Sequence, residues 1–136
     1  MNKVVQIISA IIAGIMGLIF GEMNKLFFAL LAMIAIDYTT GVMVAITKKR
    51  LSSAVGFKGI AKKIVILAFV AVGHIVGYYV FDSGEACRDM VIGFYIANEG
   101  ISILENGAKL GLPLPQKLRA ALEQLKGKKN DKKQEE

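Results

Sequence analysis

Cysteine, histidine, tryptophan and proline are scarce or missing in this chain. Its 136 residues include one cysteine, one histidine, two prolines and no tryptophan. A single cysteine, Cys87, excludes an intramolecular disulfide and a cysteine-based zinc site. The residues form no nucleophile–base set and no metal-ligand spacing, so we expect no enzyme activity, no metal and no cofactor. A lone histidine in an apolar helix, as at His74, is more often hydrogen-bonded to a neighbour than a ligand or a base.

Apolar residues are abundant instead. They make up 54% of the chain, and the mean hydropathy of +0.52 is too high for most soluble domains of this size. The net charge of +6 comes mostly from a central segment and the last twenty residues. A membrane surface explains this clustering better than nucleic acid does, because residues 126–136 contain no aromatic side chain on which bases could stack. We therefore expect a membrane protein with no nucleic-acid partner.

Four helical segments are predicted, at residues 4–21, 26–46, 64–81 and 90–112. The first and third have eighteen residues each, which just suffices to cross a hydrocarbon core about 30 Å thick. The short polar turn after the first segment predicts an antiparallel hairpin of the first two segments. The fold class is therefore all-α: a polytopic integral membrane helical bundle of three to four transmembrane helices over residues 1–112.

Residues 113–136 are predicted to form a short amphipathic helix and a basic cytoplasmic tail. Pro115 suits the first position of that helix. One face carries Leu118, Ala121, Leu122 and Leu125, and the opposite face carries Lys117, Arg119, Glu123 and Lys126. Such a helix is best placed on the membrane surface or against the basic central segment.

Small residues are spaced so that they lie on single helix faces. Gly14, Gly17 and Gly21 recur along the first segment, and Gly73 and Gly77 form a GxxxG pair in the third. Small side chains let helix backbones approach closely in a membrane. We expect these glycines to be packing positions and the protein to associate with itself.

Polar residues inside the apolar segments are the candidate functional residues. An ionised carboxylate halfway along a hydrophobic helix, as at Asp37, costs at least about 2.5–3.5 kcal/mol and needs a partner, a proton or water. Asp37 is either a structural acid paired with a lysine or threonine, or a pore-lining or gating acid. The fourth segment carries a narrow polar stripe, which faces either solvent or a bundle interior. The predicted pore-lining set is Asp37, Thr40, Asn98, Glu99, Ser102, Glu105 and Asn106.

Six basic residues, predicted to face anionic lipid headgroups, crowd residues 47–63: Lys48, Lys49, Arg50, Lys58, Lys62 and Lys63. The positive-inside rule puts this segment and the carboxyl tail on the cytoplasmic side. That orientation favours four crossings with both termini cytoplasmic. If the fourth segment is re-entrant or interfacial, three crossings remain.

Specific strings now suggest a family. Asp37 is followed by Gly41, then by AITKKRLSSAVGFKGIAKKI, and later by NEGISILENGAKLGLPLPQKLRAALEQL. This order, over Ile36 to Leu125, resembles the phage-lysis and toxin-secretion holin family. The resemblance implies a multi-pass protein of the host cell inner membrane that accumulates, oligomerises and permeabilises the membrane at a set time. An endolysin or a toxin then leaves the cell.

Two other functions fit the same residues. One is a small ion or solute channel of fixed pore size, and the other is a non-conducting membrane scaffold that recruits a partner through its basic tail. A holin and a channel differ in the size of what escapes, whereas a scaffold permeabilises nothing.

Overall fold

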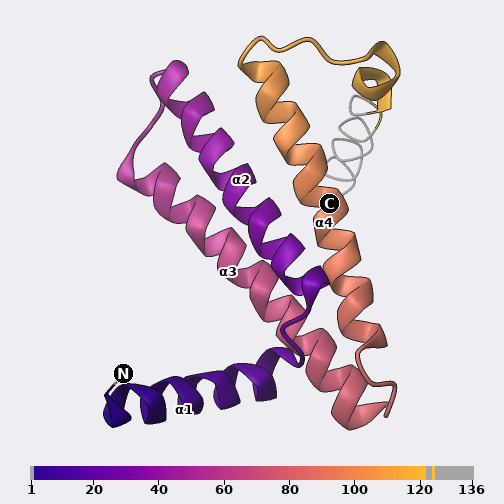
Figure 1. The fold of residues 1–136 in the computed structure, drawn as a ribbon. Helices are drawn as coiled ribbons and strands as arrows, with labels where there is room; N and C mark the ends of the chain where they lie inside the picture. Colours follow the sequence, from indigo (N-terminus) through magenta and orange to yellow (C-terminus); the bar gives the residue numbers. More distant parts are fainter. Residues whose placement is uncertain (1, 122–123, 125–136) are drawn as a thin grey trace.

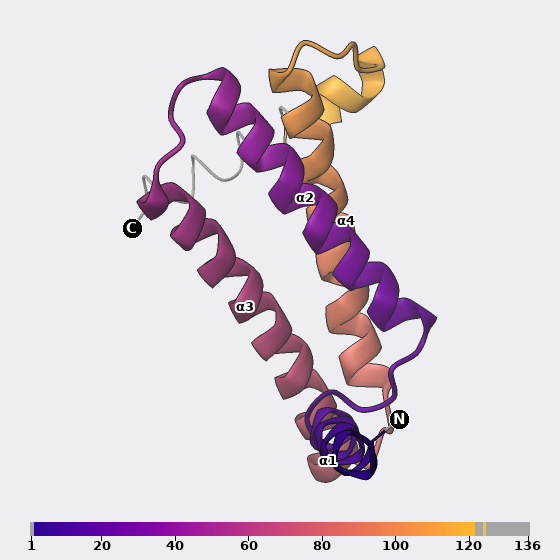
Figure 2. The same cartoon turned by 60° about the vertical axis from the view of Figure 1, so that its left-hand side comes forward.

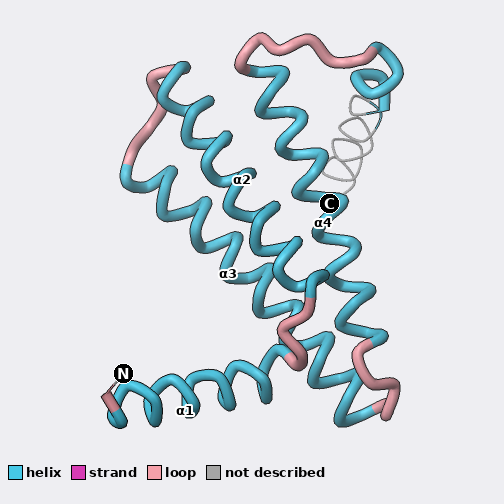
Figure 3. Tube along the Cα trace, viewed as in Figure 1, coloured by secondary structure: helices cyan, strands magenta, loops and turns pink. Residues whose placement is uncertain are grey.

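The computed structural model describes residues 2–121 and 124, and helices make up most of this part of the chain. They are α1 (Lys3–Phe20), α2 (Lys25–Thr47), α3 (Ser53–Ile75), a π-helical turn η1 (Val76–Val80) that continues α3, and α4 (Ala86–Lys109). A short helical stretch follows at residues 116–121. No strand occurs in the described residues, so the predicted all-α class is confirmed (Figure 3).

Three helices form the bundle. α2 and α4 run side by side in the same direction, and α3 packs against them in the opposite direction (Figures 1 and 2). The apolar core contains side chains from each of them: Phe27 and Leu30, Ile66 and Val70, and Ile92. Phe27 and Leu30 lie near the start of α2 and Ile92 near the start of α4, so the core occupies the end of the bundle away from residues 48–52.

Side-chain caps set where the helices begin. Asn24 Oδ1 accepts a hydrogen bond from Phe27 N at 3.1 Å, and Ser52 Oγ accepts one from Val55 N at 3.2 Å. The cap at Ser52 makes α3 begin at Ser53, whereas the sequence placed the apolar segment from Ile64. The predicted start of this helix was wrong, because residues 53–63 are already helical despite their lysines. Within the described residues, the connection between α2 and α3 shrinks to positions 48–52.

The predicted antiparallel hairpin of the first two segments was also wrong. α1 does not lie along α2; it contacts α3 and projects away from the lower part of the bundle (Figures 1 and 2). Gly21 ends α1 with φ 75°, a left-handed backbone conformation that glycine adopts readily. The connection at positions 21–24 therefore leaves α1 at a steep angle instead of folding it back.

Three helical stretches of the described chain are long and apolar enough to cross a membrane: Lys3–Phe20, Lys25–Thr47 and Ser53–Val80. α4 does not meet the same criterion of length and composition, so four crossings stay a prediction. After α4, Gly111 adopts φ 92° and the chain turns into the short helix, which begins one position after Pro115. The predicted apolar face of that helix includes Leu122 and Leu125, which, like the tail at 125–136, lie outside the described residues.

Candidate functional site: a polar cluster inside the bundle

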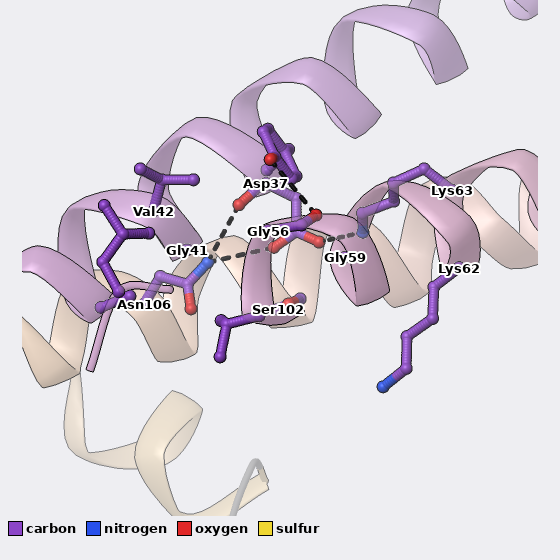
Figure 4. A pocket seen from close by; sticks show the side chains of 13 residues that line it. Asp37, Gly41, Val42, Gly56, Gly59, Lys62, Lys63, Ser102 and Asn106 are labelled. Carbon is purple, nitrogen blue, oxygen red and sulfur yellow. Dashed lines mark hydrogen bonds and ion pairs between the residues drawn. The ribbon is translucent and has the colours of Figure 1, made fainter. Parts of the chain in front are cut away.

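One charged side chain from each bundle helix meets between α2, α3 and α4. The Lys63 ammonium bonds the Asp37 carboxylate (Figure 4). It also lies 2.6 Å from Glu99 Oε2. The side chains of Asp37 and Glu99 are 7% and 2% exposed, and that of Lys63 is 18% exposed. A single ammonium therefore joins two buried carboxylates from two different helices.

An amide extends this network along α4. Asn106 Nδ2 donates to Asp37 Oδ1 at 3.1 Å and to Thr40 Oγ1 at 2.9 Å. It also lies 3.3 Å from the Asp37 carbonyl oxygen. In Figure 4, Asn106 and Lys63 approach Asp37 from different helices. Gly41 lies beside this contact, and a Cβ there would stand at ordinary van der Waals distance, 3.8 Å, from Asn106 Nδ2.

The charges in this cluster do not balance. With all three groups ionised, two carboxylates face one ammonium and the cluster carries one excess negative charge. Each ion costs several kcal/mol to move out of water, and attraction within the group offsets that cost only while every partner is in place. The arrangement is therefore stable when closed and sensitive to any movement that separates α2, α3 and α4.

A cavity of about 300 Å³ lies beside the cluster, between the three helices and toward residues 48–52. Asp37, Lys63, Ser102 and Asn106 contribute polar groups to its wall. The cavity is large enough to hold several water molecules, each of which occupies about 30 Å³ in the liquid. Part of the charged cluster therefore borders space that water can occupy.

The Gly56/Gly59 pair at the start of α3 accommodates an aromatic ring. A Cβ at Gly59 would stand 3.2 Å from Tyr38 Cε2, and Tyr38 Oη donates to the Gly56 carbonyl oxygen at 3.4 Å. The two glycines thus let α2 and α3 approach beside the cavity.

A second polar cluster, which the sequence did not reveal, lies at the lower end of the bundle. Arg88 in α4 is completely buried, and its Nη1 donates to the carbonyl oxygens of Phe20 at 3.0 Å and Glu22 at 2.6 Å. Arg88 Nε lies 2.9 Å from Glu85 Oε2, and Nη2 lies 3.0 Å from Asp89 Oδ1. Sequence reasoning missed this cluster. The available signal was an arginine directly beside an apolar helix, which requires a partner.

His74 joins this second cluster. Its Nδ1 lies 2.9 Å from Glu85 Oε1, and its ring stacks on Tyr78 with centroids 5.5 Å apart. The histidine thus lies beside a carboxylate, but its Nδ1 makes no hydrogen bond in the part of the chain that the structure describes, so the hydrogen bond favoured by the sequence stays a prediction. Within the described residues, no group of three or more His, Cys, Asp and Glu side chains could hold a metal ion.

The predicted pore-lining residues divide into two sets. Asp37, Thr40, Glu99 and Asn106 meet in the network, and Ser102 lines the adjoining cavity. Asn98 is exposed, and Glu105 is half-buried. The structure therefore brings most of the predicted set together, while their role in a pore stays a prediction.

The predicted basic surface needs one correction. Its exposed members are Lys48, Lys49, Arg50, Lys58 and Lys62. Lys63 instead points into the bundle, because two buried carboxylates attract its ammonium, whereas the adjacent Lys62 points away from the cluster (Figure 4). Lys63 is therefore the lysine partner that the structural interpretation of Asp37 required.

The predicted packing glycines also differ among themselves. At Gly14 and Gly17, no described neighbouring atom lies within 4 Å of the position that a Cβ would occupy. Gly73 and Gly77 face the start of α4, where an added Cβ would stand 3.1 Å from Val91 Cγ2 and 2.9 Å from Cys87 Cβ, respectively. A Cβ at Gly21 would stand 2.6 Å from Glu85 and His74 atoms. The last three glycines therefore serve contacts within the chain.

Comparison with known proteins identifies the family. The sequence profile of the bacteriophage holin family matches residues 14–127, which is most of the chain. The chain belongs to this family. The family match and the three apolar helices together support a holin-like, multi-pass membrane protein.

Similar chains occur in several bacteria. An uncharacterised 14.9 kDa protein in the nagH 3′ region of Clostridium perfringens is 43% identical over 111 residues, covering 82% of this chain and 84% of the relative. Protein Lmo0128 of Listeria monocytogenes is 44% identical over 105 residues, covering 77% and 74%. Protein BH0965 of Halalkalibacterium halodurans is 35% identical over 123 residues, covering 88% and 91%. No solved structure matches the chain.

Proposed function

We propose that this protein is a working holin: it oligomerises in the cytoplasmic membrane of the host cell and permeabilises it. The lesion releases an endolysin or a toxin, and timed lysis or secretion follows. Membership of the bacteriophage holin family and the apolar helices support this proposal.

The observation that carries the proposal is the interior cluster of Asp37, Lys63 and Glu99. These groups satisfy one another inside a single closed chain, so the protein can accumulate in the membrane without exposing charge to lipid. If the bundle helices separate during assembly, the same groups lose their partners and are stabilised by water. A cluster of this kind favours two states, one dormant and one hydrated, rather than a pore that is permanently open.

The exposed basic residues at the amino end of α3 support the proposed orientation, in which the α2–α3 connection faces the cytoplasm. Lys48, Lys49 and Arg50 occupy the α2–α3 connection, and exposed lysines follow in the first turns of α3. We propose that they bind anionic headgroups of the inner leaflet, with each cation contributing about 1 kcal/mol near the surface. The α2–α3 connection then faces the cytoplasm.

Induced expression tests the proposal. Membrane potential, viability and release of a co-expressed cytoplasmic peptidoglycan hydrolase are followed in time. We expect the potential to collapse at a defined moment, followed by hydrolase release and lysis. Protein that is inserted at a high level and leaves potential and viability unchanged would contradict the proposal.

The size of the released molecules separates the alternatives. A fixed-pore channel should dissipate the potential and release ions while retaining the hydrolase, and a scaffold should do neither. Asp37→Asn should shift the onset of lysis more than the amount of inserted protein, because it weakens the closed network. The matched control is Asp82→Asn, at an exposed acid outside the bundle interior.

Two glycine variants test self-association. Gly14→Leu alters an open face of α1, so it should weaken crosslinked oligomers without changing the thermal unfolding of the chain. Gly77→Leu should instead destabilise the chain itself, since Cys87 and Gly84 leave no space for a side chain. Crosslinking ladders of Gly14→Leu identical to those of the parent would show that this face meets lipid.

A further inference from the structure

The direction of α1 requires a structural cause. α1 projects away from the lower part of the bundle (Figures 1 and 2), and none of its eighteen residues is buried. It carries no charged side chain after Lys3, so it has no strongly polar face of the kind that holds a helix in a membrane interface. An apolar helix of this length is better suited to hydrocarbon, and something must fix it at its present angle to the other helices.

Arg88 holds the carboxyl end of α1. The Phe20 carbonyl is one of the terminal helix carbonyls that lack a partner within the helix, and Arg88 Nη1 donates to it at 3.0 Å. The same nitrogen donates at 2.6 Å to the Glu22 carbonyl, on the other side of Gly21. Because the connection covers positions 21–24 alone, fixing both sides of Gly21 fixes the path by which α1 leaves the bundle.

Arg88 is itself held in place. Its Nε and Nη2 donate to Asp89 Oδ1 at 3.2 Å and 3.0 Å, and Glu85 Oε2 lies 2.9 Å from Nε. The guanidinium is therefore engaged at Nε and Nη2 as well as at the Nη1 that contacts the carbonyls. His74 Nδ1 contacts the other oxygen of Glu85 at 2.9 Å and ties this carboxylate to α3. The residues that fix α1 thus come from both helices of the lower bundle end.

We propose that Arg88 is a positioning residue that holds α1 at its angle to the bundle, and that α1 swings about Gly21 when Arg88 releases the Phe20 and Glu22 carbonyls. The direction of α1 is a property of the single chain and does not depend on the proposed function. Its consequence does rest on that function: a swing changes which α1 surface, including the open positions Gly14 and Gly17, meets a second copy of the chain.

Distances between spin labels test the swing. In a Cys87→Ser background, labels are placed at exposed positions by Ile8→Cys in α1 and Val65→Cys in α3, and the protein is studied in phospholipid vesicles. Ile8 lies about 20 Å along the helix from Gly21, so a swing of about 30° moves its label by about 10 Å. We expect one narrow distance distribution for the parent, and a broadened distribution shifted by several Å for Arg88→Gln.

Two controls separate positioning from folding. Arg50→Gln makes the same change at an exposed arginine and should leave the distribution unchanged. A second label pair, Ile36→Cys in α2 and Phe94→Cys in α4, should report the same distance in parent and Arg88→Gln if the bundle stays intact.

Further variants keep the test decisive if Arg88→Gln does not insert. Arg88→Lys keeps the charge but loses the planar fork, and Gly21→Ala forces a methyl group against Glu85 and His74. Both should shift the α1–α3 distance. Parent-like distributions in these two variants, or a broad distribution in the parent, would overturn the proposal. A shifted distance with unaltered hydrolase release would support the positioning role of Arg88 and reject its link to lysis. A parent protein that releases no hydrolase would reject the proposed function, and the measured distances alone would then decide whether Arg88 positions α1.

Discussion

The two polar clusters of this bundle lie at opposite ends of its apolar core and use charge differently. In the upper cluster, Asp37, Lys63 and Glu99 bond through side chains alone, across three helices and beside a cavity. In the lower cluster, Arg88 is buried against main-chain carbonyls and bonds the connection between α1 and α2. Separation of the helices breaks every bond of the upper triad, whereas the lower cluster governs the direction in which one helix leaves the bundle.

This difference separates two kinds of control. A side-chain network between helices sets the free energy of keeping the bundle closed, because its charges are costly once they lose their partners. A guanidinium that bonds a short connection sets the angle at which α1 leaves the bundle, because the few atoms it holds determine the direction of the whole helix. Substitutions in the upper cluster should therefore affect how firmly the bundle stays closed, and substitutions in the lower cluster should affect the direction of α1, independently of each other.

The largest effect is expected for Lys63→Met. It leaves two buried carboxylates without their shared cation, and removing one partner of a buried pair typically costs about 3–5 kcal/mol. Chemical unfolding in detergent and abundance in the membrane fraction measure the loss. Lys62→Met is the matched control, because that neighbouring lysine is exposed. Equal stabilities for both variants would show that the cluster does not hold the bundle together.

Gly21→Ala sharpens the comparison at the lower cluster. Both Gly21 and Gly84 have a positive φ, of 75° and 61°. Alanine at either position should therefore lower the free energy of unfolding by about 1–2 kcal/mol through backbone strain alone. At Gly21 the added methyl group would also meet Glu85 and His74 atoms at 2.6 Å, whereas a methyl group at Gly84 would meet no described neighbouring atom within 4 Å. Overpacking should add about 1–3 kcal/mol at Gly21. Thermal unfolding of both variants measures the difference, and equal losses would contradict the tight packing of the lower cluster.

The smallest effect is the coupling between Asp37 and Glu99. Both bond Lys63, so Asp37→Asn and Glu99→Gln should be non-additive by about 1 kcal/mol in unfolding free energy. Glu99→Gln alone should be the milder change, since it leaves a balanced Asp37–Lys63 pair. Lysis onset and membrane-fraction abundance, measured for both single variants and the double variant, complete the cycle. Strictly additive effects on both would remove the proposed coupling.

The apolar helices and the upper cluster could largely be predicted from the sequence. Long uncharged runs determine where helices cross, and the cost of an acid at Asp37 or Glu99 requires that they be sheltered. The choice of Lys63 as the shared partner could not be predicted in the same way. Six basic residues crowd one segment, and the register that turns Lys63 inward and Lys62 outward depends on α3 beginning at Ser53.

The lower cluster and the direction of α1 could not be predicted from the sequence, for a different reason. Arg88 and Glu85 lie among polar residues that are typical of a solvated turn, and nothing local indicates that Arg88 bonds backbone carbonyls 66 and 68 positions away. A polar connection of four residues is compatible with a hairpin as well as with a steep angle. Long-range contacts decide between the two, and pattern alone does not encode them.

The order of the helices along the chain gives the Asp37–Lys63 bond a consequence for biosynthesis. The two residues are separated by 26 positions and both belong to the α2–α3 pair, which leaves the ribosome before α4 does. That pair can enter the lipid with the charges of Asp37 and Lys63 cancelling each other. We expect Glu99 to arrive afterwards and to meet an ammonium that is already in position. Membrane insertion would then proceed from the amino end, and Glu99, the second acid of the cluster, would enter a site that the earlier helices have prepared.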